Sequence, residues 1–384
     1  MNPLILPPLS LYVHIPWCVQ KCPYCDFNSH AQKGNIPEQD YIHHLLSDLT
    51  QDLARFKESV QDRALHSIFI GGGTPSLFSA ESIRFLLANI QQQIPFSADI
   101  EITLEANPGA AETGCFTGYA QAGVTRISMG IQSFSDEKLK ALGRIHNAKE
   151  ARSAVDFAKV CGLKSFNLDL MHGLPNQSVD QALDDLRQAI ELAPPHLSWY
   201  QLTIEPNTQF AYRPPILPDD DQLWDIFEQG HQLLTKNGYQ QYETSAYAKD
   251  GFQCRHNLNY WRFGDYLAIG CGAHGKLSFI TGDIIRYSKT KHPKGYLRGE
   301  YLYEQKNIPE IDRTFEFFMN RFRLLEPVPK IEFEQLTGLS QSTVVNQMDF
   351  ALAQQYIIET DRTWQITERG KLFLNELLEQ FLPE

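Results

Sequence analysis

The sequence predicts an α/β fold built around an incomplete (β/α) barrel of six units. Up to about residue 205, short β-rich runs alternate with helical segments, which is the pattern of a parallel sheet covered by crossover helices. Unusual polar residues and glycines recur where these runs end. In barrels of this kind the chemistry gathers at the C-terminal ends of the strands, so the functional residues are expected there.

Six runs are expected to form the strands. They are "LYVHI" (11–15), "SIFIGGG" (67–73), "IEITLEANP" (100–108), "RISMGIQSF" (126–134), "SFNLDLMHGLP" (165–175) and "SWYQLTIEP" (198–206). Between the first two runs, six apolar residues recur at helical spacing, which predicts an amphipathic helix with one buried face: Ile42, Leu45, Leu46, Leu49, Leu53 and Phe56. Further helices are expected around 79–93, 114–122, 148–161, 178–193 and 220–237.

The sequence divides into three expected regions. Residues 1–240 form the barrel, and 241–310 read as an irregular, aromatic-rich α+β region packed on it. Residues 311–384 read as helices with a short hairpin near 358–366, which is a winged-helix-like order. From residue 310 onward there are thirteen acidic and seven basic side chains, so a DNA-reading wing is not expected and we interpret this part as a packing or docking module.

Composition narrows the classes of protein. The 384 residues contain no long apolar run, so we expect no transmembrane segment, and no secretion signal is evident at the start, so we expect a cytoplasmic protein. The net charge of −12 argues against nucleic-acid binding. Both a dimer and a peripheral contact with a membrane are compatible with the sequence.

Three of the seven cysteines lie close together, as Cys18, Cys22 and Cys25 in a C-x3-C-x2-C spacing directly after the first strand. Thiolates select zinc, copper(I) or iron–sulfur clusters. Zinc would need a fourth ligand from His14 or His30, because structural zinc is four-coordinate. Accidental clustering of structural cysteines is a further alternative. We favour a [4Fe–4S] cluster with one iron that lacks a protein ligand.

Other candidate site residues follow later strands. Gly71–Gly73 let the backbone approach a ligand closely. Glu105, Gln132 and Asp169 fall at equivalent heights at the ends of three strands, and Arg144 follows in "LGRIH". Each of these has a structural alternative, such as a turn or a solvated carboxylate. Their shared position at one edge of the sheet favours a binding site.

The cysteine motif after the first strand resembles the radical S-adenosylmethionine (SAM) superfamily. With "GGGTPS", "LEANP", "RISMGIQSF", "LGRIH" and "DLMHGLP", residues 10–210 resemble the oxygen-independent coproporphyrinogen III oxidase group, and most of all its heme-chaperone branch. The resemblance implies that Cys18, Cys22 and Cys25 bind the cluster and that SAM chelates the open iron. It also implies nine SAM-contacting residues: Tyr12, Tyr24, Gly72, Gly73, Thr74, Glu105, Gln132, Arg144 and Asp169.

Two departures count against the oxidase. Oxidases of this group carry another cysteine two residues after the third cluster ligand, where this chain has Phe27, and an arm before the motif, for which Cys18 lies too near the N-terminus. The segment "CRHNLNYW" (254–261) resembles the heme-binding segment of the chaperone branch, although composition alone would make it a buried aromatic turn. The resemblance implies four heme residues: His256, Asn257, Tyr260 and Trp261. His256 is the preferred iron ligand. The Gly-rich turn "GCGAHG" (270–275), with His274 and Cys271, favours a structural role, and an auxiliary ligand role is its alternative.

Three functions remain open at this stage. The favoured hypothesis is a heme chaperone that passes heme to apo-acceptors such as respiratory enzymes, carries SAM and a [4Fe–4S] cluster, and lacks oxidase activity, although SAM cleavage stays possible. The second is the anaerobic oxidase itself, which converts coproporphyrinogen III to protoporphyrinogen IX. Radical modification of RNA is the third, and the acidic charge weighs against it.

Overall fold

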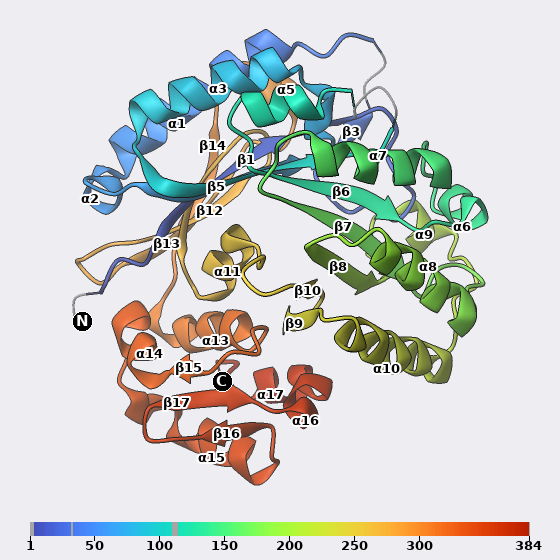
Figure 1. Cartoon of the computed structure of the whole chain (residues 1–384). Helices are drawn as coiled ribbons and strands as arrows, with labels where there is room; N and C mark the ends of the chain where they lie inside the picture. Colours follow the sequence, from blue (N-terminus) through green and yellow to red (C-terminus); the bar gives the residue numbers. More distant parts are fainter. Residues whose placement is uncertain (1–3, 32–33, 110–113, 384) are drawn as a thin grey trace.

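The computed structural model describes residues 4–31, 34–109 and 114–383. Its centre is one 12-stranded sheet with the order β14-β13-β12-β11-β1-β4-β5-β6-β7-β8-β10-β9. Figure 1 shows helices along the outer side of this sheet and the C-terminal domain beneath it. In the described part of the chain the two terminal strands do not pair, so the sheet is an open, partial barrel.

The six expected strands form the parallel centre of the sheet, and each pairs in parallel with the next. They are β1 (Leu9–Ile15), β4 (Leu65–Gly72), β5 (Phe96–Ala106), β6 (Arg126–Gln132), β7 (Ser165–His172) and β8 (His196–Gln201). The expected runs at β7 and β8 extend too far, because they include the glycines and prolines that end these strands. The predicted α/β fold is confirmed.

The helices that cover these strands also match the expectation. They are α1 (Glu38–Arg55), α3 (Ala80–Gln93), α5 (Phe116–Gln121), α7 (Ala148–Val160), α8 (Val179–Glu191) and α10 (Asp220–Lys236). Asn147, Ser178 and Asp219 begin the last three with capping boxes, which satisfy two free backbone N–H groups each. Their apolar faces pack on the sheet in one large core.

Residues 241–310 are more regular than the sequence suggests. They contain α11 (Arg255–Trp261), α12 (Pro293–Tyr296) and most of six strands, β9 (Gln240–Glu243), β10 (Ala246–Ala248), β11 (Asp265–Ile269), β12 (His274–Ser278), β13 (Ile284–Lys289) and β14 (Leu302–Asn307). The expected α+β region is present, and its short strands are interrupted by glycine turns. They extend both edges of the barrel sheet, with β11 parallel to β1 and β10 antiparallel to β8.

The C-terminal residues form most of a second core around Phe317, Phe318 and Trp364, which also includes Phe263 and Ile284 from the preceding region. The elements are α13 (Glu310–Arg321), β15 (Val328–Pro329), α14 (Lys330–Thr337), α15 (Val345–Ala353), β16 (Ile357–Glu359), β17 (Thr363–Ile366), α16 (Glu368–Leu372) and α17 (Leu374–Glu379). The strands β16 and β17 pair as the expected hairpin. Among the described helices of the whole chain, none is long and apolar enough to cross a membrane.

A buried ion cluster attaches the added strands to the barrel. Lys289 at the end of β13 is fully buried, and its Nζ lies 2.5 Å from Asp48 Oδ1 and 2.7 Å from Asp52 Oδ1, both on α1. The Tyr296 hydroxyl donates a 2.6 Å hydrogen bond to Asp48 Oδ2. Because charges this deep are tolerated only when paired, the first barrel helix and the extension of the sheet depend on each other.

The variant Lys289→Ala tests this dependence. We expect the free energy of unfolding to fall by about 3–5 kcal/mol, because two buried carboxylates would lose their cation. Chemical denaturation followed by circular dichroism measures the change. The control is Lys306→Ala on β14, an exposed lysine paired with Glu304, for which we expect a change within about 0.5 kcal/mol. Equal effects of the two substitutions would contradict the account.

Candidate functional site

The three cysteines lie on a loop fixed at the C-terminal ends of β1 and β4. Cys18 ends the short strand β2 (Trp17–Cys18), which pairs in parallel with β3 (His30–Ala31) across the loop. The Gly73 amide donates a 2.7 Å hydrogen bond to the Ile15 carbonyl. A Cβ atom on Gly73 would lie 2.5 Å from the Trp17 carbonyl oxygen. Only glycine fits this close approach, so the glycine run holds the start of the cysteine loop against the sheet.

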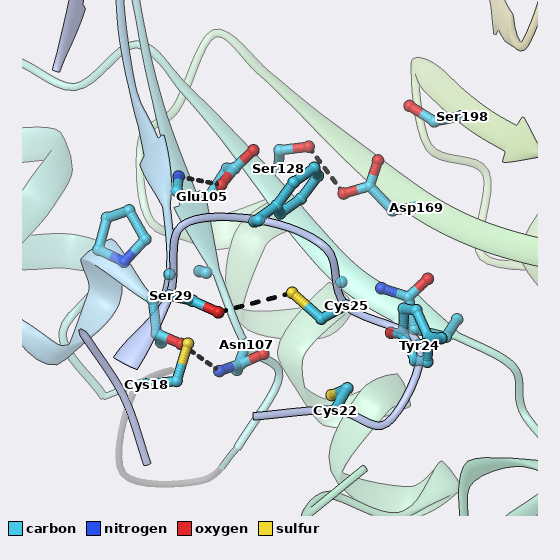
Figure 2. A pocket seen from close by; sticks show the side chains of 18 of the residues that line it. Cys18, Cys22, Tyr24, Cys25, Ser29, Glu105, Asn107, Ser128, Asp169 and Ser198 are labelled. Atoms are coloured by element: carbon cyan, nitrogen blue, oxygen red, sulfur yellow. Dashed lines mark hydrogen bonds between the residues drawn. The ribbon is translucent and has the colours of Figure 1, made fainter. Parts of the chain in front are cut away.

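The cysteines and the strand ends enclose a cavity of about 550 Å³, which we call the thiol cavity. Figure 2 shows the loop with Cys18, Cys22 and Cys25 facing the strands that carry Glu105, Ser128 and Asp169. The structure thus brings together the three cysteines and eight of the nine predicted SAM residues: Tyr24, Gly72, Gly73, Thr74, Glu105, Gln132, Arg144 and Asp169.

Arg144 is the fixed cation of the thiol cavity. It is partly buried, and its Nη2 donates to Asn107 Oδ1 at 2.6 Å and to the Gly130 carbonyl at 2.9 Å. Its Nη1 lies 3.6 Å from Cys22 Sγ. Burial raises the pKa of the Cys18 thiol. The guanidinium next to Cys22 Sγ is placed to donate a charge-assisted hydrogen bond to a thiolate ligand.

The donor set fits a cluster better than a single ion. Within the described residues, no three His, Cys, Asp or Glu side chains converge closely enough to hold one metal ion. His14, one proposed zinc ligand, has both ring nitrogens engaged, with the Tyr12 hydroxyl at 3.0 Å and the Asn28 carbonyl at 2.9 Å. Three separate soft thiolates suit an iron–sulfur cluster, whose irons are spread apart. When bound, such a cluster supplies an open iron and an electron for SAM chemistry.

Two partly buried acids, Glu105 and Asp169, line the thiol cavity opposite the loop. Glu105 Oε2 accepts a 3.0 Å hydrogen bond from the Gly72 amide, and burial, followed by the charge of Asp169, raises the pKa of Glu105 to about 8. Asp169 accepts hydrogen bonds from Ser128 Oγ at 3.0 Å and Asn167 Nδ2 at 2.7 Å. Burial also raises its pKa. These carboxyl groups are placed to receive the hydroxyl or ammonium groups of a ligand.

Tyr12 is the exception among the predicted SAM residues. It does not line the thiol cavity but lies in a second cavity of about 800 Å³, which we call the aromatic cavity. All four predicted heme residues, His256, Asn257, Tyr260 and Trp261, line this second cavity, together with Phe69, Tyr266 and His274. Gly72 and Glu105 line this cavity as well as the thiol cavity, so the assignment of Tyr12 to SAM stays a prediction.

Helix α11 borders both cavities. His256 and Tyr260, four residues apart on one face, line only the aromatic cavity, whereas Asn257 and Trp261 line both. Phe27 and Glu105 also border both cavities. A ligand in the aromatic cavity would consequently lie next to the cysteine loop.

His256 is held as a neutral imidazole. Its Nδ1 lies 3.1 Å from Ser67 Oγ, and burial lowers its pKa to about 3. A hydrogen bond at one ring nitrogen fixes the ring orientation, which is how proteins prepare the other nitrogen for a metal. The geometry is compatible with iron ligation by His256.

Several lining residues escape sequence reasoning. They are Asn107, Ser128, Ser198, Tyr200, Glu243 and Arg323. Asn107 could have been found, because it stands two residues after Glu105 at the same strand end. Ser128 and Ser198 lie within strands and carry no motif. Glu243 and Arg323 come from elements whose position on the barrel the sequence does not reveal.

Family comparisons agree with the geometry. The model of the radical SAM superfamily matches residues 12–189, and the model of the HemN C-terminal domain matches residues 308–373. The chain is 79% identical over 379 residues to heme chaperone HemW of Haemophilus influenzae, and 64% identical over 379 residues to heme chaperone HemW of Escherichia coli, with 99% of each chain covered in both comparisons. The chain belongs to the HemW family of the radical SAM superfamily.

The fold has a solved counterpart in this superfamily. Coproporphyrinogen III oxidase (HemN) from Escherichia coli superposes with a TM-score of 0.82 over 98% of this chain and 90% of that chain, at 23% identity. At this identity the likeness concerns the fold alone. Membership of the radical SAM superfamily implies SAM and a [4Fe–4S] cluster as cofactors, and the thiol cavity contains the residues suited to hold them.

Replacing Cys22 tests the cluster site. We expect Cys22→Ser to abolish the brown colour, the iron content and the EPR signal after anaerobic reconstitution, because the hydroxyl is a poor ligand for soft iron. The fold should persist, because Cys22 is only half-buried. Cys161→Ser is the matched control, since Cys161 lies just beyond α7, outside both cavities. A cluster of normal iron content in Cys22→Ser would refute the assignment.

Proposed function

We propose that this chain is a heme chaperone: it binds heme in the aromatic cavity and transfers it to apo-acceptor proteins such as respiratory enzymes. The observation that carries the proposal is that relatives aligned over 99% of this chain at 79% and 64% identity are named heme chaperones. In the proposal the transfer takes place in the cytoplasm, with peripheral contact to the membrane where the acceptor is membrane-bound.

The aromatic cavity supports heme as the ligand. Its volume of about 800 Å³ lies within the range of ligand pockets, and rings border it on several elements. Tyr12 and Phe69 come from adjacent strands, with their ring centroids 6.3 Å apart, and Tyr260 comes from α11. Such rings suit a flat apolar macrocycle, and His256 supplies a neutral imidazole for iron.

The residues at the cysteine loop support a carrier over an oxidase. Phe27, at the position of the additional oxidase cysteine, borders both cavities and is 61% exposed, so an apolar ring stands where the oxidases have a thiol. We propose that the cluster and SAM have a structural or regulatory role and that coproporphyrinogen III is not converted.

His256→Ala tests the heme ligand. We expect the affinity for heme to fall at least about tenfold and the heme absorption spectrum to change, because the iron would lose its imidazole, while the cluster stays intact. Titration of the full-length chain with heme, followed by absorbance, measures both. His172→Ala is the control: His172 is also buried and packs at a tilt against a ring, Trp199, but borders neither cavity. Unchanged affinity and spectrum in His256→Ala would exclude this ligand.

The pH dependence of heme binding gives an independent test. A proton competes with iron for an imidazole, and the competition begins below the pKa of the ring. Because burial holds the pKa of His256 at about 3, we expect nearly constant heme affinity from about pH 8 to pH 5.5. A ligand with the ordinary pKa of about 6.5 would lose roughly tenfold over this range. That loss in the wild type would indicate a different, more exposed histidine.

A further inference from the structure

Arg323 brings the C-terminal domain into contact with the thiol cavity. It lies in the turn after α13, and the next residue, Leu324, forms an isolated antiparallel bridge with Glu243 at the end of β9. The Leu325 amide donates a 3.1 Å hydrogen bond to the Tyr242 carbonyl. Among the described residues after 308, Arg323 is the only one that lines the thiol cavity. Its backbone is therefore fixed against the barrel.

Within the described residues, the guanidinium of Arg323 differs from its neighbours in forming no ion pair, although its charge acts on Glu243. Arg321 lies 3.1 Å from Glu326 and 3.0 Å from Glu332, and Arg262 lies 2.6 Å from Glu326. In the described part of the chain, Arg323 forms no ion pair, and its buried Nε has no hydrogen-bond partner. An unpaired guanidinium at the wall of the thiol cavity is suited to bind the anionic group of a ligand.

Trp261 holds the guanidinium in place and adds a second unsatisfied donor. The guanidinium carbon of Arg323 lies 4.4 Å from the centroid of the Trp261 ring, a cation–π contact. The buried Nε1 of Trp261 also has no hydrogen-bond partner among the described residues. Native proteins rarely leave buried donors without a hydrogen-bond partner, because such a donor loses its hydrogen bond to water and gains none in return. Arg323 Nε and Trp261 Nε1 are therefore both available to donate hydrogen bonds to an acceptor on a ligand.

Glu243 does not serve as the acceptor for Arg323. It is the acid nearest along the bridged backbone and lines the same cavity, yet it forms no ion pair with Arg323. One of its carboxylate oxygens accepts instead a 3.2 Å hydrogen bond from the Ser245 amide. Burial raises the pKa of Glu243, with Arg323 opposing the shift, so this acid is a weakened competitor for the guanidinium.

The geometry points to a carboxylate-binding subsite in which Arg323 and the indole N–H of Trp261 hold the carboxylate of a bound ligand. A planar guanidinium matches a carboxylate with two parallel hydrogen bonds, and indole can only donate. Two ligands could supply the group. One is heme, through a propionate, since Trp261 borders both cavities; this source rests on the proposed function. The other is SAM, through its own carboxylate.

A set of titrations tests the subsite in the anaerobically reconstituted full-length chain. Arg323→Gln removes the charge, Arg323→Lys keeps it without the planar fork, and Arg84→Gln is the matched control at an exposed arginine on α3. Each variant is titrated with heme, with heme dimethyl ester, whose propionates are esterified, with SAM and with decarboxylated SAM. Thermal unfolding midpoints confirm that each variant is folded.

If a propionate occupies the subsite, Arg323→Gln lowers heme affinity about ten- to hundredfold, Arg323→Lys lowers it less, and the dimethyl ester binds equally to all variants. If the SAM carboxylate occupies the subsite, Arg323→Gln and Arg323→Lys lower the affinity for SAM in the same order, and the affinity for decarboxylated SAM does not change. The subsite is refuted if Arg323→Gln lowers the affinity for neither heme nor SAM. It is also refuted if Arg323→Gln lowers the affinity for each carboxylate-free analogue as much as for its parent ligand. A wild type that binds no heme refutes the proposed function, and the SAM titrations then decide the subsite alone.

Discussion

The close approach of a glycine run to the chain before the cysteines is the constraint on which this site depends. Gly73 lies so near Trp17 and Ile15 that its missing Cβ is what allows β4 to hold the cysteine loop. Pairing of β2 with β3 closes the loop from the other side. The three thiols therefore stand at the C-terminal edge of the parallel sheet, opposite the acids of later strands. Without that contact the thiol cavity would lose one wall.

Helix α11 connects the two cavities through residues that line both of them. This helix packs beside β1, β4 and β11. His256 and Tyr260 on it line the aromatic cavity, and Asn257 and Trp261 line both cavities. A buried, neutral His256 on this helix suits reversible iron binding, because protonation does not compete near neutral pH. Trp261 on the same helix forms a cation–π contact with Arg323, so the C-terminal domain contacts α11 directly.

The sequence predicts the centre of this structure well and its periphery poorly. The six parallel strands and their helices have strong periodicity, and the motifs at the strand ends lie together because parallel strands share one edge. The strands of 241–310 are short, and their pairing partners lie far away in the chain, so no local pattern shows that they extend the sheet. Tyr12 illustrates the same point within the site. Its side chain leaves β1 toward the aromatic cavity, and a motif cannot tell which of two adjoining cavities a residue faces.

Arg323 marks the limit of sequence reasoning most clearly. An arginine in a turn of an acidic domain carries no signal, and its role depends on a contact between residues more than sixty positions apart. Only the packed structure shows that the neighbouring arginines form ion pairs and that Arg323 forms none with the described residues.

One reaction mixture tests the central claim most directly. The reconstituted chain, loaded with heme and supplied with SAM and a reductant, is mixed with an apo-form heme enzyme and coproporphyrinogen III. Heme in the acceptor is followed by absorbance, and porphyrinogens are followed by mass. The account predicts that heme moves to the acceptor while coproporphyrinogen III remains unchanged. Heme that stays on the chain while protoporphyrinogen IX accumulates would contradict it.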